Sequence, residues 1–211
     1  MPKSNHIKVL LVRSGPNEWD RTGRLSGSAD LPLAEDGAED VTRLAAGLAP
    51  GCIARVCCGP EESAQVTADL IARQVGVRAR IKPELHEIGL GRWEGMAATD
   101  AEGRYGSTYR QWRENPTGVV PPGGEMITDA AERIIPEIRD VLARCKADDS
   151  CGVCLVLRPM AFGLVRCWLR GDELSSLWAA AETEEGFEWF LVDRSLVRSG
   201  GLAPGAVRDA V

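Results

Sequence analysis

The sequence predicts an α/β fold, a three-layer sandwich in which a mostly parallel central sheet has helices on both faces. Two observations predict it. Short, β-rich apolar runs alternate with amphipathic segments of helical length, which is the pattern of βαβ units. The apolar runs carry few polar residues, as expected of parallel strands that are buried on both faces. With 211 residues, the chain is long enough for one well-buried core, and we expect a single domain over residues 1–211.

Each element is predicted from periodicity and from breaker residues. Strands are expected at Ile7–Val12, Ile53–Cys58, Val77–Ile81, Cys151–Leu157 and Trp189–Val192. Helices are expected at Ala34–Leu48, Glu61–Val75, Thr99–Trp112, Ile127–Lys146 and Phe162–Arg170, with Pro60 at a first helical position. The tail over 198–211 is expected to be flexible. The irregular region 84–127 is too long for a plain connection, and we expect it over the carboxyl ends of the strands, where α/β folds bind ligands.

Composition narrows the function classes. The net charge of -6 argues against a nucleic-acid or anionic-membrane partner, because either would require a basic face. No apolar run approaches the roughly 20 residues of a membrane span. The first residues lack the apolar region of a signal peptide, so a cytoplasmic protein is expected. No cofactor is predicted.

The seven cysteines are interpreted as small buried hydrophobes. Cys151 and Cys154 have the spacing of a redox or zinc pair. They lie at the entrance to a strand, however, and no second pair with histidines completes a zinc site. No metal site is predicted.

Candidate functional residues follow the predicted strands. Arg13 and Ser14 come after the first strand, Ser63 after the second and Arg158 after a late one, while Glu87 lies in the irregular region. An arginine at a strand end can bind an anion through its planar guanidinium group. Each arginine could equally pair with a carboxylate such as that of Glu87, and the local pattern leaves both possibilities open.

Ordered motifs over about residues 7–170 carry a more specific signal. The segment Val12–Asp20 resembles an Arg-His-Gly signature with a Glu-Trp-Asn continuation, and Arg21–Gly27 resembles the Arg-x-Gly-Arg-x-x-Gly that follows it. Further matches are Asp30–Gly37, Leu85–Gly95 and the Pro-Gly-Gly-Glu at Pro122–Glu125. These motifs resemble those of the histidine phosphatase superfamily, the phosphoglycerate mutase-like proteins.

The resemblance implies a phosphate pocket of two histidines and two arginines, in which one histidine attacks phosphorus and a carboxylate protonates the leaving oxygen. Carried over by position, Arg13 keeps the first arginine and Glu87 keeps the acid. Ser14 stands at the nucleophilic histidine, Arg158 at the second histidine and Ser63 at the second arginine.

These departures predict a catalytically inactive member of the family. A serine hydroxyl needs an adjacent base, and Arg158 cannot be that base because it does not deprotonate. Arg13, Arg158 and Ser63 could still form a phosphate pocket for a phosphorylated small molecule or a protein partner. One alternative is an atypical phosphomonoesterase that uses His86 or an activated water, although neighbouring side chains of an extended segment point in opposite directions. A second alternative is a purely structural or protein-interaction domain.

Overall fold

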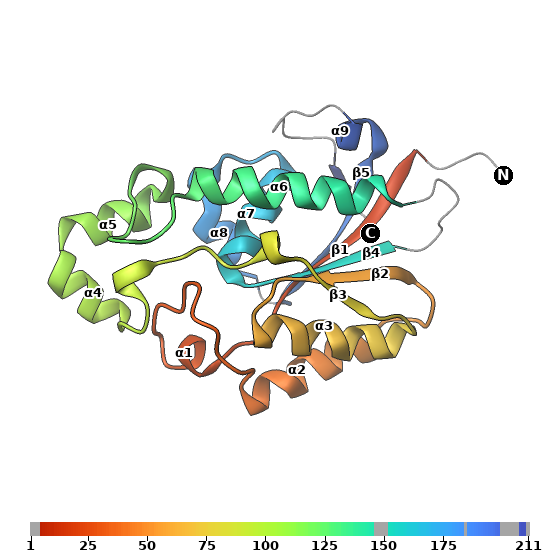
Figure 1. Cartoon of the computed structure of the whole chain (residues 1–211), viewed down its shortest axis with the longest axis horizontal. Coiled ribbons are helices and arrows are strands. Elements are labelled where there is room, and N and C mark those ends of the chain that lie inside the picture. Colours follow the sequence, from red (N-terminus) through yellow and green to blue (C-terminus); the bar gives the residue numbers. More distant parts are fainter. Residues whose placement is uncertain (1–4, 146–151, 184, 199–206, 210–211) are drawn as a thin grey trace.

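The computed structural model describes residues 5–145, 152–183, 185–198 and 207–209. Its core is a six-stranded sheet in the order β3-β2-β4-β1-β5-β6, drawn in Figure 1. The strands are β1 (His6–Arg13), β2 (Ile53–Cys58), β3 (Ala79–Ile81), β4 (Gly152–Leu157), β5 (Phe187–Asp193) and β6 (Val207–Asp209). Strands β1 to β4 are parallel to one another, whereas β5 runs antiparallel to β1 and to β6. The predicted α/β fold with a mostly parallel sheet is confirmed.

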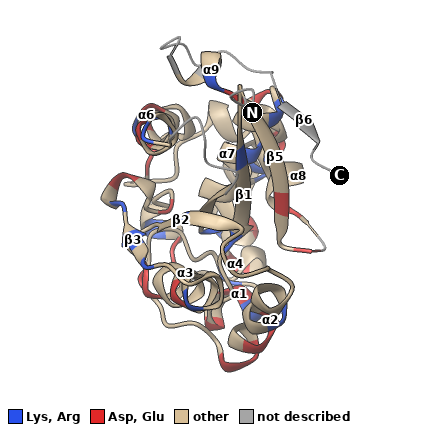
Figure 2. Cartoon of the chain, turned by 90° about the vertical axis from the view of Figure 1, so that its right-hand side faces the viewer, with Lys and Arg blue, Asp and Glu red and all other residues tan. Residues whose placement is uncertain are grey.

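Helices cover both faces of this sheet. The helices are α1 (Glu18–Arg21), α2 (Glu35–Ala46), α3 (Glu62–Val75), α4 (Ala98–Tyr105), α5 (Ser107–Glu114), α6 (Ile127–Ala143), α7 (Pro159–Arg170), α8 (Leu177–Ala181) and α9 (Arg194–Arg198), with 3₁₀ turns at Pro83–Leu85, Gly91–Trp93, Pro116–Gly118 and Leu174–Ser176. Figure 2 shows α2 and α3 on one side of the sheet and α6 and α7 on the other.

The sequence of β1 explains this layering. Ile7, Val9 and Leu11 belong to the apolar cluster that includes α6 and α7, whereas Leu10 and Val12 belong to the cluster that includes α2 and α3. Successive side chains of a strand point to opposite faces, so a strand that is apolar throughout is buried on both sides.

One predicted helix is in fact two. The helix expected at Thr99–Trp112 is divided at Gly106, where φ is +50° and ψ is -114°, into α4 and α5. Only glycine adopts such a backbone conformation readily, so the chain turns there instead of continuing as a helix.

A proline occupies the first turn of α7 and not, as expected, that of α3. Pro60 precedes the N-cap residue of α3, Glu61, and the helix begins at Glu62. Pro159 instead occupies the first turn of α7, which therefore begins three residues before the predicted Phe162. A missing N–H is tolerated there because the first helical N–H groups have no partner within the helix.

Several predictions fall partly outside the described residues. Cys151 and Lys146 lie there, as do residues 199–206 and 210–211 of the tail, although Val207–Asp209 within it form β6. Single-domain organisation and tail flexibility stay predictions. Within the part of the chain that the structure covers, no helix has the length and apolar character to cross a membrane. The cytoplasmic location also stays a prediction.

The cysteines that the structure describes are free thiols: Cys52, Cys57, Cys58, Cys145, Cys154 and Cys167. Burial raises the pKa of Cys58 to about 12 and that of Cys167 to about 11. Thiols held in the protonated form are weak nucleophiles and weak metal ligands. Four of these cysteines are buried, as interpreted, whereas Cys52 and Cys145 are only partly buried.

Candidate functional site

Three of the predicted site residues lie at the carboxyl ends of parallel strands. Ser14 follows β1, Arg158 follows β4, and Ser63 lies in the first turn of α3 after β2. Their exposed fractions are 4% for Ser14 and 1% for both Ser63 and Arg158. The guanidinium Nη1 of Arg158 lies 3.4 Å from the hydroxyl of Ser63, and the N–H of Ser14 donates to Leu157 at 2.7 Å. The fold therefore brings these positions together, but in a buried polar cluster.

The carboxylate that pairs with Arg158 is Asp20 of α1. The guanidinium donates from Nη1 to Oδ2 at 2.9 Å and from Nη2 to Oδ1 at 3.3 Å. The Arg158 side chain is 1% exposed and that of Asp20 is 21% exposed. Of the two possibilities left open by the sequence, Arg158 pairs with a carboxylate, and that carboxylate is Asp20 and not Glu87. Asp20 stands where the resembling motif continues Glu-Trp-Asn, and this change from amide to acid was the signal that could have identified it.

Asp20 is held in place by its own segment. The N–H of Asn17 donates to Asp20 Oδ2 and the N–H of Asp20 donates to the Asn17 side chain, both at 2.9 Å, which forms a reciprocal capping box for α1. The hydroxyl of Ser26 donates to Asp20 Oδ1 at 2.9 Å. The aspartate therefore links the loop after β1 to the buried end of β4.

Glu87 makes a different contact from the one expected. Its carboxylate accepts hydrogen bonds from the backbone N–H groups of Met160, Ala161 and Ile88, each at 2.8 Å. Two of these donors belong to the first turn of α7, whose N-terminal N–H groups lack partners in the helix. Burial raises the pKa of Glu87 to about 7, although the charge of Arg158 and the backbone hydrogen bonds oppose this shift.

Arg13 and His86 lie at the edge of this cluster. Arg13 Nη1 donates to the carbonyl of Ala181 at 3.2 Å, and the side chain is half-buried. Burial lowers the pKa of Arg13, against the opposing charges of Asp20 and Glu182. His86 Nδ1 lies 2.9 Å from the Glu87 carbonyl oxygen. The ring thus contacts the backbone of the following residue, and no hydrogen bond joins it to Arg13 or Arg158 within the described residues.

Arg133 of α6 fixes the segment that carries Glu87. Its guanidinium pairs with both oxygens of Glu125 at 2.7 Å and donates to the carbonyls of Glu84 and His86 at 2.8 Å and of Glu87 at 3.3 Å. Sequence reasoning missed this residue, because nothing in the helical pattern of α6 distinguishes it from a surface arginine.

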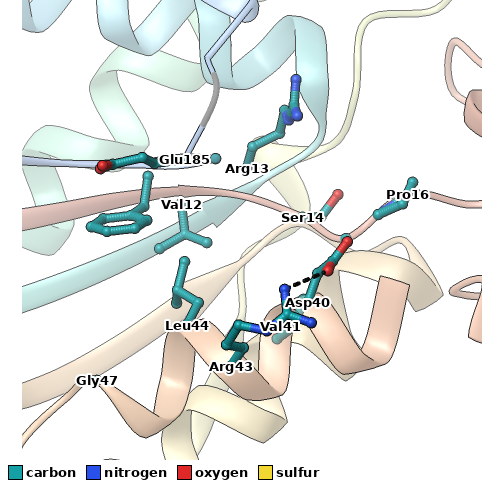
Figure 3. A pocket seen from close by; sticks show the side chains of 13 residues that line it. Val12, Arg13, Ser14, Pro16, Asp40, Val41, Arg43, Leu44, Gly47 and Glu185 are labelled. Atoms are coloured by element: carbon teal, nitrogen blue, oxygen red, sulfur yellow. Dashed lines mark hydrogen bonds and ion pairs between the residues drawn. The ribbon is translucent and has the colours of Figure 1, made fainter. Parts of the chain in front are cut away.

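An open cavity of about 540 Å³ lies beside this cluster (Figure 3). It is formed by the end of β1, by α2 and by the start of β5, and it is lined by Val12, Arg13, Ser14, Gly15, Pro16, Asp40, Val41, Arg43, Leu44, Gly47, Glu185, Gly186 and Phe187. Among the predicted site residues, only Arg13 and Ser14 line it, and the Arg13 side chain points away from Leu44 and Arg43.

Several buried polar atoms of the cluster lack hydrogen-bond partners. They include Ser14 Oγ, Arg158 Nε and Glu61 Oε2, while the other oxygen of Glu61 accepts the Glu87 N–H at 2.5 Å. Ser14 therefore has no base within hydrogen-bonding distance among the described residues. No group of three or more His, Cys, Asp or Glu side chains that could hold a metal ion occurs in this described part either.

This architecture, with its candidate residues at the ends of β1, β2 and β4, defines an α/β protein with a mostly parallel sheet. The sequence model of the histidine phosphatase superfamily (branch 1) matches residues 9–185, and the chain belongs to this family. The predicted family is confirmed.

Two relatives of similar length carry the names of phosphatases. Phosphoserine phosphatase 1 of Hydrogenobacter thermophilus is 27% identical over 173 residues, covering 82% of this chain and 81% of the relative. Adenosylcobalamin/alpha-ribazole phosphatase of Salmonella typhimurium is 29% identical over 189 residues, covering 86% and 93%. The solved structure of Bacillus stearothermophilus YhfR superimposes with a TM-score of 0.80 at 22% identity, covering 97% of this chain and 95% of the other, and it supports the fold.

Proposed function

We propose that this chain is a non-catalytic histidine phosphatase family protein, in which an internal ion pair closes the phosphate site. The observation that carries the proposal is the buried Arg158–Asp20 pair, with Nη1 to Oδ2 at 2.9 Å, at the end of β4. The resemblance implies a histidine at the position of Arg158. A guanidinium cannot act as an acid–base group there, because it remains protonated.

The absence of a nucleophile at the end of β1 supports the same proposal. The chain contains two histidines, His6 and His86, and neither follows β1 or β4. Ser14 has no neighbouring base to take its proton, and a serine hydroxyl is a weak nucleophile without one. Losing a positioned nucleophile or general acid–base group slows turnover by several powers of ten.

A second candidate function is phosphomonoester hydrolysis by an activated water. The names of two relatives, both called phosphatases, support this candidate better than they support an inactive protein. Glu87 adds a specific observation. With a pKa of about 7, its carboxyl group is partly protonated near neutral pH and could protonate a leaving oxygen.

The role of a non-catalytic member would be to bind a phosphorylated small molecule or a protein partner through Arg13, Arg158 and Ser63, or to act as a structural domain. The burial of Arg158 and its pairing with Asp20 support the structural role as long as this ion pair is intact. Binding at this place requires that the aspartate give up its contacts with Arg158.

The test is hydrolysis of p-nitrophenyl phosphate by the wild-type protein, by an Arg13→Ala variant and by an Arg43→Ala control. Arg43 is exposed on α2 and lines the open cavity without belonging to the predicted site. We expect no turnover above the buffer rate in any sample. Turnover that disappears in Arg13→Ala but persists in Arg43→Ala would establish the phosphatase instead.

A further inference from the structure

Two departures from the resembling motifs meet in space. Asp20 stands where the motif has an amide, and Arg158 stands where it has a histidine. The two side chains are separated by 138 positions in the chain and are joined by two hydrogen bonds, at 2.9 and 3.3 Å. A carboxylate presents two oxygens to a guanidinium in the same way as an oxyanion such as phosphate.

The residues around this pair offer more donors than the carboxylate uses. Arg158 Nε, Asn17 Nδ2 and Ser14 Oγ are buried and have no hydrogen-bond partner. Unpartnered buried donors are costly, and a tetrahedral oxyanion with four oxygens could satisfy more of them than a carboxylate with two. The hydroxyl of Ser63 accepts a hydrogen bond from Arg158 Nη1 at 3.4 Å, which leaves its own O–H able to donate to an oxyanion.

The charges also place the aspartate between two cations. Asp20 pairs directly with Arg158, and it is one of the two negative charges that act on the half-buried Arg13. Removing the carboxylate charge would leave the Arg158 guanidinium, 1% exposed, without its ion-pair partner. An uncompensated buried cation is unfavourable, so it would favour the entry of an external anion.

We propose that Asp20 is an internal ligand that occupies a latent oxyanion site formed by Arg158, Ser63 and Arg13. Inorganic phosphate binds there once the aspartate is neutralised. This inference rests on the proposed function, because it takes the site as closed in the wild-type protein. In that protein, phosphate competes with a tethered carboxylate whose effective concentration is high, and such competition weakens binding.

The experiment is calorimetric titration of inorganic phosphate at constant ionic strength and about pH 6. The variants are Asp20→Asn and Asp20→Ser, both of which remove the charge and keep a side-chain hydrogen-bond acceptor. Asp36→Asn is the matched control. It removes an exposed carboxylate of α2 that pairs at 2.8 Å with Arg21, which lies in the same short helix as Asp20. That variant loosens α1 without freeing Arg158. The double variant Asp20→Asn/Arg158→Gln tests the proposed cation.

We expect both Asp20 variants to bind phosphate at least tenfold more tightly than the wild type and the Asp36→Asn control. This gain should disappear in the double variant. Both Asp20 variants should also melt at a higher temperature with phosphate than with chloride at the same ionic strength.

Equal affinities in folded Asp20 variants and wild type would overturn the proposal, as would an equal gain in Asp36→Asn. Failure of both Asp20 variants to fold even in phosphate would also overturn it, because the anion should replace the lost charge. Turnover by the wild-type protein would refute the proposed function. The titration measures phosphate binding and does not depend on turnover. The two failures are therefore distinguishable.

Discussion

Replacing Glu87 by glutamine should remove a pH dependence of stability that this residue imposes. Burial raises the pKa of Glu87 from 4.5 to about 7. A carboxyl group whose pKa is higher in the folded protein binds its proton more tightly there. Its contribution to stability is therefore fully present below about pH 4.5 and is lost as the pH rises through 7. A difference of about 2.5 between the two pKa values corresponds to about 3 kcal/mol in the free energy of unfolding.

The glutamine variant should also carry a cost in stability that is the same at every pH. Both carboxylate oxygens accept backbone N–H groups, and an amide nitrogen in place of either oxygen leaves at least the N–H of Met160 or Ala161 without an acceptor. Such an unsatisfied buried donor costs about 1 to 3 kcal/mol. This loss does not change with pH, so the slope of stability against pH distinguishes it from the titration.

The assay is urea unfolding of the wild type and Glu87→Gln between about pH 5 and pH 8. Glu114→Gln, which changes an exposed carboxylate at the end of α5, serves as the control. The wild type and the control should each lose about 2 to 3 kcal/mol more than Glu87→Gln across this range. Parallel curves for all three proteins would refute the reasoning, because they would show that Glu87 keeps the same protonation on unfolding.

Two further predictions concern the segment that carries Glu87. Arg133→Ala should lower the free energy of unfolding by about 2 to 3 kcal/mol, because it leaves a carboxylate and three carbonyl oxygens without their donor. Urea unfolding measures this, and a change below about 0.5 kcal/mol would contradict it. Gly91→Ala should lower the melting temperature, since φ is +52° there and a Cβ would lie 2.5 Å from the Pro122 carbonyl oxygen. Gly103→Ala in α4, where a Cβ would meet no atom within 4 Å, should be neutral or stabilising; equal losses in both variants would count against the steric explanation.

The sequence by itself determined the layers of the fold and the strand ends at which the candidate residues lie. Apolar runs of a few residues predict strands such as β2 at its observed bounds, Ile53–Cys58, because burial on both faces leaves a pattern within one short segment. The motifs likewise located Ser14, Ser63 and Arg158 at strand ends, since a parallel sheet gathers these ends at one edge.

Only the tertiary structure decided which groups contact one another. The partner of Arg158 is Asp20, from a helix 138 positions away, and Glu87 contacts the first turn of α7 instead of an open pocket. Pairing of this kind depends on the geometry of folded segments and on the need of buried charges and N–H groups for partners. The local pattern of residues indicates neither this geometry nor these partners. The position of each candidate residue could therefore be predicted, whereas its partner could not.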